Sequence, residues 1–254
     1  MAVRGFRISV TTEKGLALPK VTEKLKNPSV IEAICELRFA GGISYTILPG
    51  AMRERLKGKF PNFEVLPAAF MSAFSLPASV AFHRFKISDS PFIVQTGPGL
   101  PTINVLPGYP SFAAFRDVIL YALGQFREIY DPGTPTRVGL RYINHLQRRT
   151  EKRELKDYLR MVMQYPIELE KQPQEISARF TFPYGSVGTL ALAIGFPAST
   201  DRGAFGALLD LDLYRDNPQF ELNRFPEWLD EAHDVIHGAF VSSVSTEVMT
   251  EMRG

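Results

Sequence analysis

The chain is 254 residues long, with a formal net charge of +2, 45% hydrophobic residues and 22% charged residues. A chain of this length can bury a sizeable core, either in one sheet-based domain or in two small domains. The near-neutral charge excludes a strong overall attraction to nucleic acid or to an anionic membrane. The sequence has one cysteine and no run that approaches the ~18 continuous apolar residues of a membrane span. We therefore expect a soluble cytoplasmic protein without an internal disulfide and without membrane contact.

The first half of the chain begins with a polar arm over residues 1–29 and continues with strand patterns. Apolar and polar residues alternate from Ile31 to Phe39, which predicts a strand with Cys35 on its buried face. Proline is favoured in the first helical turn, so a short basic helix should begin at Pro49. Four strand-like runs follow, namely FEVLP, VAFHRFKI, FIVQT and TINVL. The segment Gly97-Pro98-Gly99 predicts a hairpin between the last two runs.

The stretch FAAFRDVILYALGQFREIY has the clearest helical pattern. Its apolar residues recur at steps of three and four, the spacing of one helical face. Ser111 can cap its start, and Asp131-Pro132-Gly133 should end it. Because this face is strongly apolar, we expect the helix to lie across a sheet.

From Thr136 the same order of elements begins again. RVGLRYIN predicts a strand and EKRELKDYLRMV a helix. Four more strand-like runs follow: YPIELE, EISARFTF, TLALAIGF and GALLDLDLY. The stretch FPEWLDEAHDVIHGAFVSSV predicts a closing helix that is opened by Pro226.

The order strand, helix, four strands, long helix therefore occurs twice, and ELRF at residues 36–39 corresponds to GLRY at residues 139–142. This order predicts an α+β fold, in which two pseudo-twofold-related β-α-β4-α halves form one large twisted antiparallel sheet with the long helices packed on one face. After the arm, residues 30–254 form a single domain made of the halves 30–133 and 134–254. The topology resembles the duplicated TATA-box-binding-protein-like fold, a resemblance that carries no function with it.

Several stretches resemble the landmarks of a sporadically distributed prokaryotic family of uncharacterised proteins, whose signature is a GLRYIN strand. They are NPSVIEAICELRF, RVGLRYINHL, LLDLDLY and WLDEAHDVIHGAF. The resemblance implies an accessory protein of scattered occurrence, of the kind carried on mobile or defence-related loci. The family brings no established reaction, so no catalytic residues carry over. Val94-Gln95 and Ile103-Asn104 match its first-half pattern, whereas Val105 stands where an aromatic residue is usual.

Arg141, Tyr142, Asn144 and His145 form the most polar and aromatic cluster of the sequence, and Arg38 is the counterpart of Arg141. A sheet face with arginines and aromatic rings could bind a peptide, a nucleotide or a nucleic-acid strand. The same residues could instead lie beneath the helices, with Tyr142 and Asn144 hydrogen-bonded at a helix end. If each arginine meets an acid of its own half, the arginines support the fold. If both face a groove, they are candidates for ligand binding.

Two further pairs could bind a metal ion. His233 and His237 are one helical turn apart, but a third ligand is not evident, and both should lie on the flank or solvent side of their helix. Asp210 and Asp212 share a strand face, where cross-strand arginines would pair with them. We predict no metal site and no cofactor.

No phosphate loop, serine elbow, dinucleotide fingerprint or cysteine cluster occurs in the sequence. We therefore predict a non-enzymatic binding or assembly module that acts on a protein partner through its sheet face or edge; such a sheet also allows a homo-oligomer. One alternative is a small-ligand or nucleotide binder, hydrolytic or not, with a pocket between the halves near Arg38, Arg141, Tyr142 and Asn144. A second alternative, nucleic-acid binding by a saddle-shaped sheet, rests on topology alone.

Overall fold

The computed structural model describes seven stretches of the chain: residues 25–40, 47–67, 80–129, 133–147, 154–161, 175–199 and 205–254. The expected N-terminal arm therefore lies outside the described residues up to residue 24. The strand expected at YPIELE, residues 165–170, also lies outside them.

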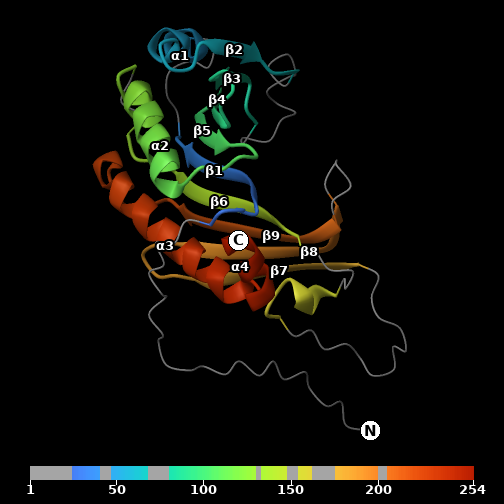
Figure 1. Ribbon diagram of the computed structural model, residues 1–254. Coiled ribbons are helices and arrows are strands. Elements are labelled where there is room, and N and C mark those ends of the chain that lie inside the picture. The colour runs from blue at the N-terminus through green and yellow to red at the C-terminus, as the bar shows by residue number, and fades with distance from the viewer. Residues whose placement is uncertain are drawn as a thin grey trace.

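The nine described strands form one open antiparallel sheet (Figure 1). They are β1 (Val30–Arg38), β2 (Asn62–Val65), β3 (His83–Lys86), β4 (Phe92–Gly97), β5 (Leu100–Val105), β6 (Arg137–Leu146), β7 (Ile176–Pro183), β8 (Thr189–Ser199) and β9 (Phe205–Asp216). Their order across the sheet is β2-β3-β4-β5-β1-β6-β9-β8-β7. The predicted α+β fold with a large antiparallel sheet is confirmed, and β1 and β6 meet at its centre.

The four described α-helices are α1 (Leu48–Leu56), α2 (Phe112–Arg127), α3 (Phe225–Ser243) and α4 (Thr246–Arg253). The long helices α2 and α3 lie along the same face of the sheet (Figure 1). Arg116 of α2 joins them by donating to both carboxylate oxygens of Asp230 of α3, at 2.6 and 2.9 Å. Among the described residues, no helix is both long enough and apolar enough to cross a membrane.

The core lies between the sheet and these two helices, on what we call the helix-covered face. Strand alternation brings Leu37 of β1, Leu140 of β6 and Leu211 of β9 to this face, where each is fully buried. Cys35 shares the face, and burial raises the pKa of its thiol. The opposite side of the sheet, called the open face, carries the alternate residues of the same strands.

Local sequence signals explain several element ends. The Ala114 N–H donates to the Ser111 side chain at 3.2 Å, so Ser111 caps α2 as predicted. The expected hairpin joins β4 to β5: Gly97 pairs with Leu100, and Gly99 takes the positive φ of +64° that glycine adopts readily.

The helix predicted at EKRELKDYLRMV is wrong for its described part. Within residues 154–161 only Leu155–Asp157 forms a 3-10 turn. The backbone there makes tertiary contacts instead: Leu159 forms a bridge with Val244, and the Ser245 N–H donates to the Tyr158 carbonyl at 2.9 Å. These contacts outweigh the local helical preference.

The short helix α4 is absent from the predicted elements. Ser245 caps it by accepting from the Val248 N–H at 3.2 Å, and its Val248, Met249 and Met252 are buried.

Candidate functional site

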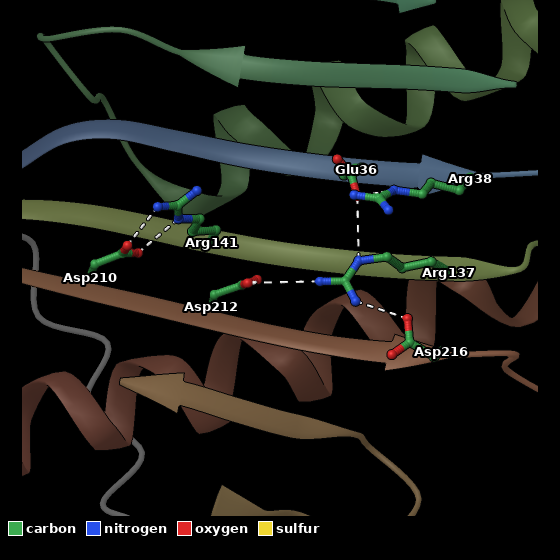
Figure 2. A network of polar contacts seen from close by, with 7 residues as sticks. All are labelled: Glu36, Arg38, Arg137, Arg141, Asp210, Asp212 and Asp216. Carbon is green, nitrogen blue, oxygen red and sulfur yellow. Dashed lines mark hydrogen bonds and ion pairs between the residues drawn. The ribbon is translucent and has the colours of Figure 1, made fainter. Parts of the chain in front are cut away.

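Arg38 and Arg141 both lie on the open face at the centre of the sheet, and each bonds an acid of its own half of the chain (Figure 2). Arg38 Nε donates to Glu36 Oε1 at 2.7 Å. Arg141 donates through Nε and Nη2 to the two oxygens of Asp210, at 2.8 and 2.6 Å. The bond to Asp210 raises the pKa of Arg141, so the guanidinium group stays charged.

Arg137, two residues before Gly139 on β6, links three strands of the open face (Figure 2). Its Nη1 donates to Asp216 at 2.8 Å, and its guanidinium lies 4.1 Å from the centre of the Tyr214 ring. Its Nε is 3.4 Å from Glu36 Oε1, the oxygen that Arg38 also binds. The carboxylate of Glu36 is therefore shared between two arginines that face each other across the β1–β6 pair.

Tyr142 and Asn144 lie on the helix-covered face instead. The Tyr142 hydroxyl is 3.1 Å from that of Tyr109, and burial raises the pKa of Tyr142 well above its usual value. Asn144 accepts from the Ser29 hydroxyl at 3.0 Å and donates to the Leu209 carbonyl at 3.3 Å. Both side chains support the packing beneath the helices.

The prediction of a single pocket near Arg38, Arg141, Tyr142 and Asn144 is therefore wrong. Neighbouring residues of a strand point to opposite faces, so the sheet separates the arginines from Tyr142 and Asn144. His145 follows on β6, is buried, and has its Nδ1 at 3.0 Å from Gln147 Nε2. It does not line the hollow described next.

The open face contains a hollow of about 350 Å³ over Gly139. Its described lining comprises Ile34, Glu36, Arg38, Ala81, Gln95, Leu100, Thr102, Asn104, Arg137, Gly139, Arg141 and Asp212. Gly139 lies between Arg137 and Arg141 on β6 and opposite Glu36 on β1. Because glycine has no side chain, the tall side chains around this position enclose a depression.

Asp212 differs from the other acids of the network. Its side chain is only 21% exposed, and Arg137 Nη2 is 3.8 Å from its Oδ2, beyond hydrogen-bond distance. Among the described residues, no group donates a hydrogen bond to this carboxylate. Burial raises its pKa, an effect that the charges of Arg137 and Arg141 oppose. Asp212 is thus a largely buried acid at the hollow with unused acceptor capacity.

Two side chains of β5 add further unused capacity to the opposite wall. Asn104 Nδ2 donates to Glu32 Oε1 at 2.8 Å, which orients its amide. Its Oδ1 atom and the hydroxyl of Thr102 are buried without a hydrogen-bond partner among the described residues. Buried polar groups of this kind usually have partners, so their occurrence at a hollow indicates space for a polar ligand.

The metal candidates do not form a chelating site. The rings of His233 and His237 lie parallel, with centroids 5.9 Å apart, and His233 stacks on Phe112 of α2 at 3.7 Å. His233 lies on the flank of α3, one of the two positions expected for it, and α2 packs against that flank. Asp210 is bound to Arg141. Over the described stretches, no three His, Cys, Asp or Glu residues gather to hold a metal ion.

The position of Gly139 at the hollow was not predicted, although the sequence contains a signal for it. A glycine inside a strand pattern often marks a close approach by a ligand or another backbone. The sequence did not distinguish Asp210 from Asp212, because each lies between two leucines on the same strand.

A scan of the chain against protein-family models gives no match, and a search of curated proteins gives none either.

Proposed function

We propose that this protein is a cytoplasmic, non-enzymatic binding module that receives a side chain of a protein partner on the open face of its sheet. The observation that carries this proposal is the hollow over Gly139, on the side of the sheet opposite α2 and α3. A central hollow rimmed by ordered polar side chains is the geometry in which a protein interface places an anchor residue.

The ion pairs around the hollow support the proposal because they fix its walls before a partner arrives. Arg141 is held by the two hydrogen bonds that it donates to one carboxylate, and Arg137 is held by Asp216 and by the ring of Tyr214. Ordered side chains lose little conformational entropy on binding. The open face therefore offers a preformed surface rather than a flexible one.

The lining also favours binding over catalysis. Its described members include no histidine, cysteine or serine, and Thr102 supplies their one hydroxyl group. The arginines are bonded to carboxylates, so none is poised to activate a nucleophile. A convergent nucleophile, base and oxyanion donor are what a hydrolytic site requires.

Filling the hollow tests the proposal. A Cβ added at Gly139 meets only ordinary contacts of 3.8 to 3.9 Å, so Gly139→Leu should fold normally and project into the hollow. The matched control is Gly58→Leu, whose added Cβ meets nothing within 4 Å and which lies after α1, away from the hollow. Tagged wild type and both variants are expressed in the native host, and bound proteins are compared by quantitative mass spectrometry.

We expect a protein that wild type and Gly58→Leu retain equally and that Gly139→Leu loses. Identical sets of bound proteins for all three chains contradict the proposal. Circular dichroism and thermal unfolding of the purified variants confirm that a loss does not reflect misfolding.

A small polar ligand is the second candidate, because the volume of about 350 Å³ falls within the range of small-molecule pockets. Thermal-shift screening of nucleotides, amino acids and organic acids tests it. The expected result is a rise in melting temperature that Gly139→Leu abolishes. If no compound changes the melting temperature, this result counts against a small polar ligand and favours a protein partner.

Nucleic acid is a poorer match for the open face. Carboxylates are mixed with the arginines there, and they repel a phosphate backbone. Retention on DNA at low salt that falls steeply with added salt would argue for this alternative.

A further inference from the structure

We infer that the side chain received by the hollow is a lysine or an arginine of the partner protein, with Asp212 as the carboxylate that binds its charge. This inference rests on the proposed function of the open face and names the chemistry of the anchor. Gly139 provides the space, and the wall formed by β5 provides further acceptors.

The pairing of charges leaves two acids without an arginine at hydrogen-bond distance: Glu32, which accepts from the Asn104 amide, and Asp212, which accepts no hydrogen bond from the described residues. Arg38 has Glu36 at 2.7 Å. Arg137 has Asp216 at 2.8 Å, and Arg141 has Asp210 at 2.6 Å. Each guanidinium thus has a carboxylate at hydrogen-bond distance, whereas the nearest approach of Arg137 to Asp212 is 3.8 Å.

The network of ion pairs as a whole also contains more carboxylates than guanidinium groups. Its carboxylates are Glu32, Glu36, Asp210, Asp212 and Asp216, and its guanidinium groups are Arg38, Arg137 and Arg141. The lining itself holds all three arginines and two of the acids, Glu36 and Asp212. With the three acids that are bonded to lining residues, acids outnumber arginines by five to three. An added cation improves this balance, and an added anion worsens it.

One group at the hollow without a hydrogen-bond partner, Arg137 Nε, is a donor, and it faces Glu36 Oε1 at 3.4 Å. The other unused groups are of the type that a cation needs. Asp212 and the Oδ1 atom of Asn104 can only accept, and the hydroxyl of Thr102 can accept as well. An ammonium group has three donors and no acceptor, and a guanidinium group has five donors and no acceptor. A carboxylate or phosphate would leave the acceptors of Asp212 and Asn104 without partners.

The hollow also suits the aliphatic part of such a side chain. Ile34, Ala81 and Leu100 contribute apolar surface to the lining. Lysine and arginine bury their methylene stems along apolar surface while the charged end reaches a polar group. The rigid rim would then hold the stem, and Asp212 would hold the end.

The test titrates the full ¹⁵N-labelled chain with four capped tripeptides that have glycine at both ends. The middle residue is lysine, arginine, norleucine or glutamate. Norleucine keeps the length of the lysine stem without its charge. The variant Asp212→Asn keeps the shape of the acid and removes its charge, Asp212→Glu keeps the charge, and Asp117→Asn on the exposed side of α2 is the control.

We expect the lysine and arginine peptides to produce saturable shifts at the Gly139 amide, and the norleucine and glutamate peptides to produce none. Asp212→Asn should weaken binding by about tenfold or more, and Asp117→Asn by less than about threefold. Asp212→Glu should restore at least part of the affinity. A norleucine peptide that binds as tightly as the lysine peptide overturns the inference, and so does an Asp212→Asn variant with unchanged affinity.

The partner recovered in the Gly139 comparison separates this inference from the proposed function. Loss of that partner by Gly139→Leu but not by Asp212→Asn overturns the cationic anchor and leaves the binding face intact. Retention by both variants overturns both proposals. Loss by both, with retention by Asp212→Glu, supports both proposals, whether or not the isolated tripeptides bind.

Discussion

The two faces of the sheet are formed by the same strands, but one is packed under helices and the other carries ion pairs and a hollow. On the helix-covered face, Leu140 is fully buried and Tyr142 is hydrogen-bonded to Tyr109. On the open face, Arg137 and Arg141 lie between carboxylates, and Gly139 leaves a hollow. The residues named on the covered face are buried beneath the helices, whereas the open face has both space and unused acceptors. Stability and binding should therefore separate residue by residue along β6.

Neighbouring residues on β6 provide the largest expected difference. Leu140→Ala removes fully buried apolar surface and should lower the free energy of unfolding by about 2–5 kcal/mol. Arg141→Ala removes a side chain that is 42% exposed and should cost about 1–2 kcal/mol, because it leaves Asp210 without its partner. Urea denaturation measures both values. Similar losses for the two variants would contradict the division between the faces.

Titratable groups on the two sides of the sheet should also change the free energy of unfolding in opposite directions as the pH falls. On the helix-covered side the group concerned is His233 of α3. Burial, with a contribution from His237, lowers the pKa of His233 from 6.5 to about 4. Between pH 6.5 and about pH 4, His233 therefore binds a proton in the unfolded chain but not in the folded chain. Stability is intact above pH 6.5 and falls as the pH drops toward 4, by as much as about 1.4 kcal/mol per pH unit.

Replacing His233 by phenylalanine tests this effect, because a phenyl ring can keep the stacking on Phe112. We expect His233→Phe to reduce the loss of stability between pH 6.5 and pH 4 and to change little at pH 8. Chemical denaturation across this range supplies the slope. An unchanged slope would show that protonation of His233 does not weaken the packing of α2 on α3.

Two acids on β9 give the next comparison, and here the open face is divided within itself. Asp210→Asn weakens a two-hydrogen-bond pair with Arg141 and should cost about 1–2 kcal/mol at neutral pH. Asp212→Asn should be neutral or stabilising, because burial raises the pKa of Asp212. Stability from this group is greatest below its unfolded pKa of about 3.8 and declines as the pH rises through the folded pKa.

The advantage of Asp212→Asn over wild type should therefore appear as the pH is raised and vanish in acid. Thermal unfolding of both variants from pH 3 to pH 8 distinguishes the two acids. A loss for Asp212→Asn as large as that for Asp210→Asn would place Asp212 among the structural ion pairs.

Sequence patterns predicted the fold better than they predicted the site. The alternation through Cys35 and the cap at Ser111 are local signals, so the strand β1 and the start of α2 were foreseeable. The 3-10 turn at Leu155–Asp157 depends on Val244 and Ser245, which are about 90 residues away. Whether Asp212 has an arginine partner depends on how arginines and acids pair across three strands. The sequence of one strand does not contain that information.

The register at the centre of the sheet supports our proposal that residues 30–133 and 134–254 are related halves. Glu36 and Gly139, the first residues of ELRF and GLRY, stand opposite each other. Arg38 and Arg141 each lie two residues beyond this pair, on opposite strands and in opposite directions. A twofold axis through the Glu36–Gly139 pair would exchange them, as two related halves require. The glycine is where this relation is broken, and the hollow lies there.

The smallest expected effect is that of Gly139→Ala, and it bears most directly on the open face. The added methyl group meets the Tyr214 side chain at 3.8 Å and Asp212 at 3.9 Å, both ordinary contacts. Alanine also restricts the unfolded chain, so the variant should gain up to about 1 kcal/mol of stability. The same change at Gly97 should cost about 1–3 kcal/mol, because its Cβ would collide with the carbonyl oxygen of Val80. If Gly139→Ala is the destabilising one, the glycine serves the fold of β6; if it is stable yet binds the lysine peptide less tightly, the glycine serves the hollow.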